Sequence, residues 1–254
     1  MSMTIPEISA LALSLTMAVA AGLVGCFAVM RRMTLAADAI SHIALPGIGV
    51  ALLLRINPML GALAMLMLGA VLIWALERQT GITTETVTGV VFSVALAIGS
   101  MITSGDQLIE ALFGGPGKLS ILELSLGLLG SAAVILFILR ARNSLVVALV
   151  SPEIAQTSGI NVARMNLLFL LAFALTIALG VRFLGVLLMG SLIIIPAATA
   201  RHLARNLFGM LAISVAVAVV STVIGTYAAS LIHRETGPFI ITIAGGIFFL
   251  SLLA

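Results

Sequence analysis

An acid and an imidazole inside one apolar stretch are the side chains of this sequence best placed to do chemistry. Asp38 and His42 lie four residues apart in the stretch 35–54, which reads LAADAISHIALPGIGVALLL. On a helix they share one face, about one turn apart, and together can reach one divalent cation. Pro46 follows His42 by four residues. Because proline has no N–H, the carbonyl of His42 loses its usual helical partner.

The stretch has the length of one membrane crossing, about 20 residues for a ~30 Å hydrocarbon core. An alternative role for Asp38 and His42 is a polar pair that bonds to itself and holds helices together. Such intramembrane hydrogen bonds contribute only ~0.6 kcal/mol on average, whereas a charged Asp at mid-helix costs ~2.5–3.5 kcal/mol. One such bond therefore does not offset the cost of the charge, and the residues alone leave the metal contact and the polar pair equally open. Two side chains are an incomplete shell for zinc, which prefers about four ligands, so a second chain or water would have to complete it.

The composition is that of a polytopic membrane protein. Of 254 residues, 62% are hydrophobic and 8% are charged, which predicts an all-α fold in one membrane domain spanning 1–254. No Lys or Arg precedes Arg31, so we expect a retained first span instead of a cleaved signal. A single cysteine excludes a disulfide within the chain. The candidate spans are 8–30, 35–54, 58–76, 85–104, 120–139, 165–181, 184–200, 207–231 and 239–254.

Loop cations predict the orientation. If the N-terminus lies outside and every candidate crosses, eight of the 12 Lys and Arg residues fall on the cytoplasmic side, as the positive-inside rule requires. His42 is then near the bilayer middle, with Asp38 one turn closer to the cytoplasm. Only Arg182 and its neighbours separate 165–181 from 184–200, so one of these could be a partial or re-entrant segment. We therefore predict eight or nine crossings.

Two loops stand out on this topology. The outer loop 104–120 is rich in turn formers and carries Asp106 and Glu110, and 140–164 is the longest cytoplasmic segment. Within the second, Ser151 is an expected N-cap, Pro152 and Glu153 suit a first turn, and Gly159 would close a short helix over 154–157. Such a capped helix suits docking to another protein; the alternative is a plain surface loop.

Several motifs together resemble the membrane subunit of ATP-binding-cassette importers for zinc and manganese, and most closely the zinc-uptake permeases. Their order and spacing carry the resemblance, which runs nearly end to end. The motifs are Gly25–Met33 followed by Asp38–His42, Glu85–Phe92, Leu112–Gly114, Ser151–Ala155 with Gly159, Gly185–Leu188 through Leu192–Ala200, and Thr236–Pro238.

The resemblance implies a fold like that of type II importers in a bacterial cytoplasmic (inner) membrane. It implies a homodimer of this chain, two copies of a cytoplasmic ATP-binding subunit and an extracytoplasmic metal-binding protein, with no nucleic acid partner. It makes Asp38 and His42 the metal contacts. The implied ATPase-docking residues are Ser151, Pro152, Glu153, Ala155 and Gly159. The ion, Zn²⁺ or Mn²⁺, would be cargo, and no cofactor is expected to stay bound.

Alternatives remain open at this point. One imidazole and one carboxylate suit zinc and manganese respectively, and iron is a further possibility. A proton-coupled secondary carrier could use the same pair, although we find no inverted repeat. The sequence holds no Walker A motif and no H-E-x-x-H or G-x-S-x-G motif, so we expect that this chain is not an enzyme. Pro46 and Pro196 are predicted to be either gate hinges or structural kinks.

Overall fold

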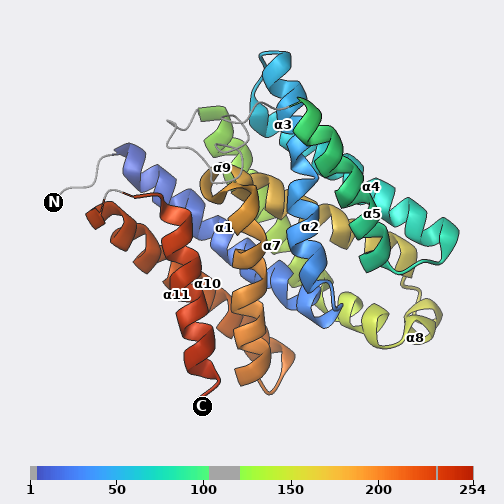
Figure 1. The fold of residues 1–254 in the computed structure, drawn as a ribbon. Coiled ribbons are helices and arrows are strands. Elements are labelled where there is room, and N and C mark those ends of the chain that lie inside the picture. The colour runs from blue at the N-terminus through green and yellow to red at the C-terminus, as the bar shows by residue number, and fades with distance from the viewer. Residues whose placement is uncertain (1–4, 103–120, 233, 254) are drawn as a thin grey trace.

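The described part of the chain is helical throughout. The computed structural model describes residues 5–102, 121–232 and 234–253, and within these ranges it holds helices and turns but no strand (Figure 1). The all-α prediction is therefore confirmed. The helices are α1 (Ile5–Met30), α2 (Thr34–His42), α3 (Ala44–Leu53), α4 (Pro58–Thr80), α5 (Thr84–Ile102), α7 (Ile121–Val150), α8 (Pro152–Thr157), α9 (Val162–Leu203), α10 (Leu207–Ile232) and α11 (Thr236–Ser251).

The predicted number of crossings agrees with the helices that the structure describes. Seven segments are long and apolar enough to cross a membrane, and two shorter apolar helices, Leu188–Leu203 and Thr236–Ser251, bring the candidates to nine. All nine coincide with predicted spans. The predicted outer loop 104–120, with Asp106, Glu110 and the Leu112–Gly114 motif, lies outside the described residues.

The second predicted span is two helices and not the single helix expected. α2 ends at His42 and α3 begins at Ala44. At the junction the Ile43 N–H bonds to the Ile40 carbonyl at 3.0 Å, a tighter turn than an α-helix makes. The physical reason is Pro46, which cannot donate to the His42 carbonyl and lies in the first turn of α3. The interruption therefore falls immediately after the histidine.

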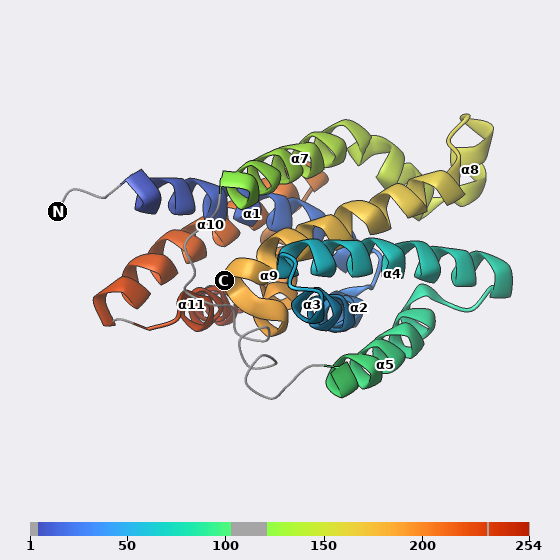
Figure 2. The same ribbon diagram turned by 90° about the horizontal axis from the view of Figure 1, so that it is seen from above.

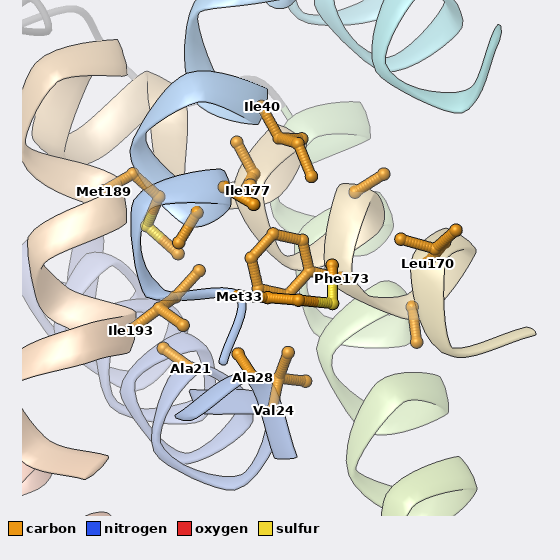
Figure 3. Close-up of a cluster of buried hydrophobic side chains, with 14 of the residues drawn as sticks. Ala21, Val24, Ala28, Met33, Ile40, Leu170, Phe173, Ile177, Met189 and Ile193 are labelled. Atoms are coloured by element: carbon orange, nitrogen blue, oxygen red, sulfur yellow. The ribbon is translucent and has the colours of Figure 1, made fainter. Parts of the chain in front are cut away.

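The predicted spans 165–181 and 184–200 form one helix that bends sharply. α9 has 42 residues, and the Met189 side chain lies against Gly180. In a straight helix these positions would be about 13.5 Å apart along the axis, so the axis must turn between them. In Figure 3, Phe173 and Ile177 from the first limb point into the same cluster as Met189 and Ile193 from the second. Gly180 allows the close return because it has no Cβ.

The fifth predicted span is longer than expected. α7 runs from Ile121 to Val150, about three turns past position 139 and well into the segment predicted as a cytoplasmic loop from 140 to 164. Nothing in the sequence stops a helix before Ser151 and Pro152, and arginines are tolerated in a helix that has reached the membrane surface. The true connection to α9 is therefore short.

The core lies where α1, α2 and both limbs of α9 meet. Its largest fully buried side chains include Phe27, Phe169, Phe173 and Ile177. In Figure 2, α5 lies at one edge of the molecule and α10 with α11 at the opposite side. The second limb of α9 packs directly on α2, because a Cβ built on Gly190 would lie only 3.0 Å from the Asp38 Cα. This close approach sets the position of α2.

Candidate functional site

The predicted metal pair lies on α2, on a face that the single chain leaves partly uncovered. Asp38 is exposed, and His42 is half-buried just before the helix interruption. His42 lies about 12 Å along the axis from Thr34, where the 20-residue span begins. Asp38 is thus an exposed acid at membrane depth. A charged side chain there is costly against lipid, so this face is better suited to another chain or to a water-filled passage.

His42 faces α5. Its ring centroid is 5.5 Å from that of Phe92, with the planes tilted by 51°. Its Nδ1 atom is buried and has no hydrogen-bond partner among the described residues. Nδ1 of His42 therefore makes no hydrogen bond to a neighbouring helix, whereas a histidine that served only to join helices would be expected to make one.

The chain alone cannot complete a metal shell from its described residues. Within the described ranges, no group of three or more His, Cys, Asp or Glu side chains is placed to hold an ion. The carboxylate of Asp38 and the imidazole of His42 are groups that could serve as one oxygen and one nitrogen ligand, and Pro46 cannot donate to the backbone oxygen of His42. These groups lie on a helix face that is exposed at Asp38.

The two prolines behave differently. Pro46 is buried, and a Cβ on Gly99 of α5 would lie 3.2 Å from its nitrogen, so α5 braces the start of α3. Pro196 lies inside α9, which stays helical through it. The sharp turn of α9 falls between Gly180 and Met189 instead, so the main bend is not at the proline.

The predicted cytoplasmic helix is present and capped as expected. The Ser151 hydroxyl accepts from the Ile154 N–H at 3.4 Å, and Pro152 occupies the first position of α8. Gly159 has φ +78°, a left-handed conformation that favours glycine. Figure 1 shows α8 at the edge of the molecule, beside the start of α9. The predicted start and stop signals are confirmed.

Burial divides the predicted docking residues of α8 into two groups. Ser151 is partly exposed, and Pro152, Glu153 and Gly159 are exposed, whereas Ala155 is fully buried. Ala155 therefore seats the helix and offers no surface to a partner. Ile154, which the prediction omitted, is 60% exposed. The sequence signal for this exposed apolar side chain is an isoleucine placed between acidic and small residues at the start of a helix.

A set of contacts between helices near α8 was not predicted. The Arg31 guanidinium donates to Asn166 Oδ1 at 3.0 Å and lies 4.4 Å from the centre of the Phe169 ring. Trp74 Nε1 donates to the Ala163 carbonyl at 2.9 Å. Burial lowers the pKa of Arg31 to about 10, and Glu77 opposes that shift, so the group stays charged at neutral pH. These contacts fix the start of α9 to the α1–α2 turn and to α4.

Comparison with known proteins agrees with this architecture. The chain matches the model of the ABC 3 transport family over residues 7–254. The high-affinity zinc uptake system membrane protein ZnuB of Haemophilus influenzae is 32% identical over 235 residues, covering 90% of this chain and 89% of that protein. The manganese transport system membrane protein MntC of Listeria monocytogenes is 28% identical over 248 residues, covering 96% and 89%.

A solved structure has the same fold. PsaBC from Streptococcus pneumoniae in complex with Fab aligns with a TM-score of 0.83 at 26% identity, covering 98% of this chain and 91% of that one. The resemblance predicted from the motifs is thereby confirmed. By the family match along nearly its whole length, this chain belongs to the ABC 3 transport family of multi-pass membrane permeases.

Proposed function

We propose that this chain is the permease subunit of an importer that moves a divalent transition-metal ion, preferentially zinc, across a bacterial cytoplasmic membrane. Asp38 and His42 receive the ion as it passes. The observation that carries the proposal is the exposure of Asp38 at membrane depth beside a His42 with no partner at Nδ1. A carboxylate and an imidazole in that setting supply ligands that a passing cation can exchange for water.

The same exposure supports a homodimer. Lipid does not stabilise a charged carboxylate at this depth, whereas a second copy related by two-fold symmetry would bring a second Asp38 and His42 to the same passage. Two pairs supply four side-chain ligands, the number that zinc prefers. Because transport requires release as well as binding, a shell of few ligands shared between chains suits a transit site.

The energy source in this proposal is a pair of cytoplasmic ATP-binding subunits that dock on α8. In this proposal 1–254 is one permease domain, and this chain does not itself hydrolyse ATP. An extracytoplasmic metal-binding protein delivers the ion. The exposed Ile154 and Glu153 on a capped helix support the docking role, and the family membership favours this arrangement over a secondary carrier.

Zinc is favoured over manganese on ligand chemistry. For a given nitrogen and oxygen site, divalent affinity rises from manganese to zinc, and the zinc relative is 32% identical against 28% for the manganese one. The two ions are separated by measuring uptake of each alone and in competition. Preferential uptake of manganese at equal concentrations would replace zinc by manganese in the proposal, and the same measurement with ferrous iron tests the third ion.

The test of the site uses the full chain co-expressed with its ATPase and metal-binding protein in cells that lack other importers of the metal. We expect Asp38→Asn and His42→Ala each to lower zinc uptake by at least about tenfold, since even outer-shell changes cost 10–100-fold in affinity. The controls are Glu85→Gln and His202→Ala, which change exposed groups elsewhere in the chain. Normal uptake in both site variants would refute the assignment.

A separate experiment tests docking. Glu153→Lys reverses a charge on the exposed face of α8, and Gly159→Pro disturbs the residue with φ +78° that closes it. Both should uncouple ATP hydrolysis from transport while the permease stays folded in the membrane. Full coupling in both variants would contradict the docking role without touching the metal site.

A further inference from the structure

Thr88 on α5 is a buried hydroxyl that differs from most buried hydroxyls in the described helices. Buried Ser and Thr side chains in helices usually bond to a carbonyl one turn back. Five do so here at 2.7–2.9 Å, namely Ser41, Ser131, Thr176, Thr199 and Thr222. Thr88 is 0% exposed, yet its Oγ1 has no hydrogen-bond partner among the described residues. Ser221 on α10 shares this property but lies far in sequence from Asp38 and His42.

Thr88 lies on the side of α5 that packs against α2 and α3. Its buried neighbours on that side are Val91, Ala95 and Gly99. A Cβ on Gly99 would lie 2.9 Å from the Leu45 Cβ, and the Phe92 ring packs on His42. The side from Thr88 to Gly99 is therefore the one that meets the helix bearing the metal pair.

The register brings Thr88 to the level of that pair. Phe92 on α5 lies against His42, and Gly99, further along α5, lies against Leu45, which is further along the chain than His42. The two segments therefore run in the same direction. In Figure 1 both helices run upward along the chain, with α5 inclined to α2. Since Thr88 is one turn before Phe92, this register places it at about the level of the α2 turn that precedes His42.

His42 and Thr88 are two of the four buried side-chain polar atoms without partners among the described residues, the others being on Arg31 and Ser221. A histidine that binds a metal through one ring nitrogen almost always donates the other N–H to an acceptor, which fixes its tautomer and orientation. Nδ1–H of His42 can donate and the hydroxyl oxygen of Thr88 can accept. The two unpartnered groups are therefore a complementary donor and acceptor on two helices that pack together.

We propose that Thr88 is a positioning residue for the metal pair. Its hydroxyl accepts the Nδ1–H of His42 while Nε2 faces the passing ion. This rests on the proposed function, since it assigns His42 to the metal. Thr88 does not itself contact the ion, and its effect is on affinity for the ion and not on the rate of the ATP-driven step.

The test compares variants of Thr88 in the full chain with its ATPase and metal-binding protein. Thr88→Val keeps the shape and removes the hydroxyl, and we expect the KM for zinc uptake to rise about 10-fold or more, within the 10–100-fold range of outer-shell changes, with maximal rate retained. Thr88→Ser restores the hydroxyl and should bring KM back to within about twofold of the native value. The control is Ser93→Ala, which removes an exposed hydroxyl of the same helix that bonds to Gly89 and should leave KM unchanged.

A second comparison separates positioning from packing. Thr88→Ala removes the same hydroxyl with less bulk and should reproduce the rise in KM; a rise in the Val variant alone would mean altered packing and overturn the proposal. In a His42→Ala background, Thr88→Val should have no further effect. If His42→Ala impairs uptake but Thr88→Val adds an equal loss in both backgrounds, Thr88 does not act through His42. If His42→Ala is itself silent, the proposed metal site fails instead.

Discussion

Replacing Gly190 by Ala is the sharpest probe of how α9 positions the metal pair. The new Cβ would lie 3.0 Å from the Asp38 Cα, 3.1 Å from its nitrogen and 3.3 Å from the Ala37 carbonyl oxygen. Ordinary contacts between carbon atoms are ~3.5–4.0 Å. All three neighbours are backbone atoms, so no side chain can turn aside. α2 must therefore move away from α9 by a few tenths of an ångström to restore normal contact.

The expected effects on stability and transport differ in size. Overpacking costs about 1–3 kcal/mol, while Ala in place of Gly in a helix gains up to about 1 kcal/mol. The net loss of unfolding free energy should be about 0–2 kcal/mol. A shift of ~1 Å in a group that must meet its substrate precisely can cost about 100-fold. For a shift of a few tenths of an ångström we therefore expect zinc uptake to fall by roughly 3–10-fold in a protein that still folds.

The matched control is Gly245→Ala on α11, where an added Cβ meets nothing within 4 Å. That variant should keep full uptake and gain slightly in stability from helix propensity. Uptake is measured in cells, and thermal unfolding is followed on the purified permease in detergent. If Gly190→Ala transports as well as Gly245→Ala, then the α9 contact does not set the position of Asp38, and the account of the site is wrong.

Three further predictions concern the cytoplasmic side. Ile154→Asp should weaken co-purification of the ATPase subunit, because it places a charge where a 60% exposed apolar side chain now projects, and unchanged co-purification would count against α8 as the docking surface. Arg31→Gln removes the cation over the Phe169 ring and should lower the free energy of unfolding by about 1–3 kcal/mol. Its control is Arg32→Gln at an exposed position, which should change that free energy by less than about 0.5 kcal/mol. Equal melting temperatures for the two variants would refute the prediction. Asn161→Ala removes the cap that accepts the Arg164 N–H at 2.9 Å and should cost about 1 kcal/mol, measured by the same unfolding assay.

The sequence predicted those features that depend on local chemistry. Apolar runs gave the spans because backbone groups in lipid must bond within their own helix. Ser151, Pro152 and Gly159 predicted the ends of α8 because capping and backbone φ are decided within a few residues. The spacing of Asp38 and His42 predicted their shared face for the same reason.

Features set by contacts between distant segments were not predicted. The bend in α9 depends on Gly180 receiving Met189 and on Gly190 approaching α2, and composition shows neither. The exposed position of Asp38 follows from which helices pack around α2, so the sequence could place it at mid-membrane but not on an uncovered face. Thr88 was read only as part of a motif, because its lack of a partner is visible only once α5 is set against α2.

The bent helix α9 connects α8, the proposed docking helix, to α2, which carries the proposed metal pair. Four residues separate the end of α8 from the start of α9, which Asn161 caps. Its first limb is bonded to α4 through Trp74 and to the α1–α2 turn through Arg31. Its second limb meets the backbone of Asp38 at Gly190. We therefore expect a displacement imposed on α8 to reach α2 through two contacts, that of Arg31 with Asn166 and that of Gly190 with the backbone of Asp38. Because packed helices move as units and not by continuous deformation, we expect substitutions at either contact to change the coupling of hydrolysis to transport even though neither touches the ion.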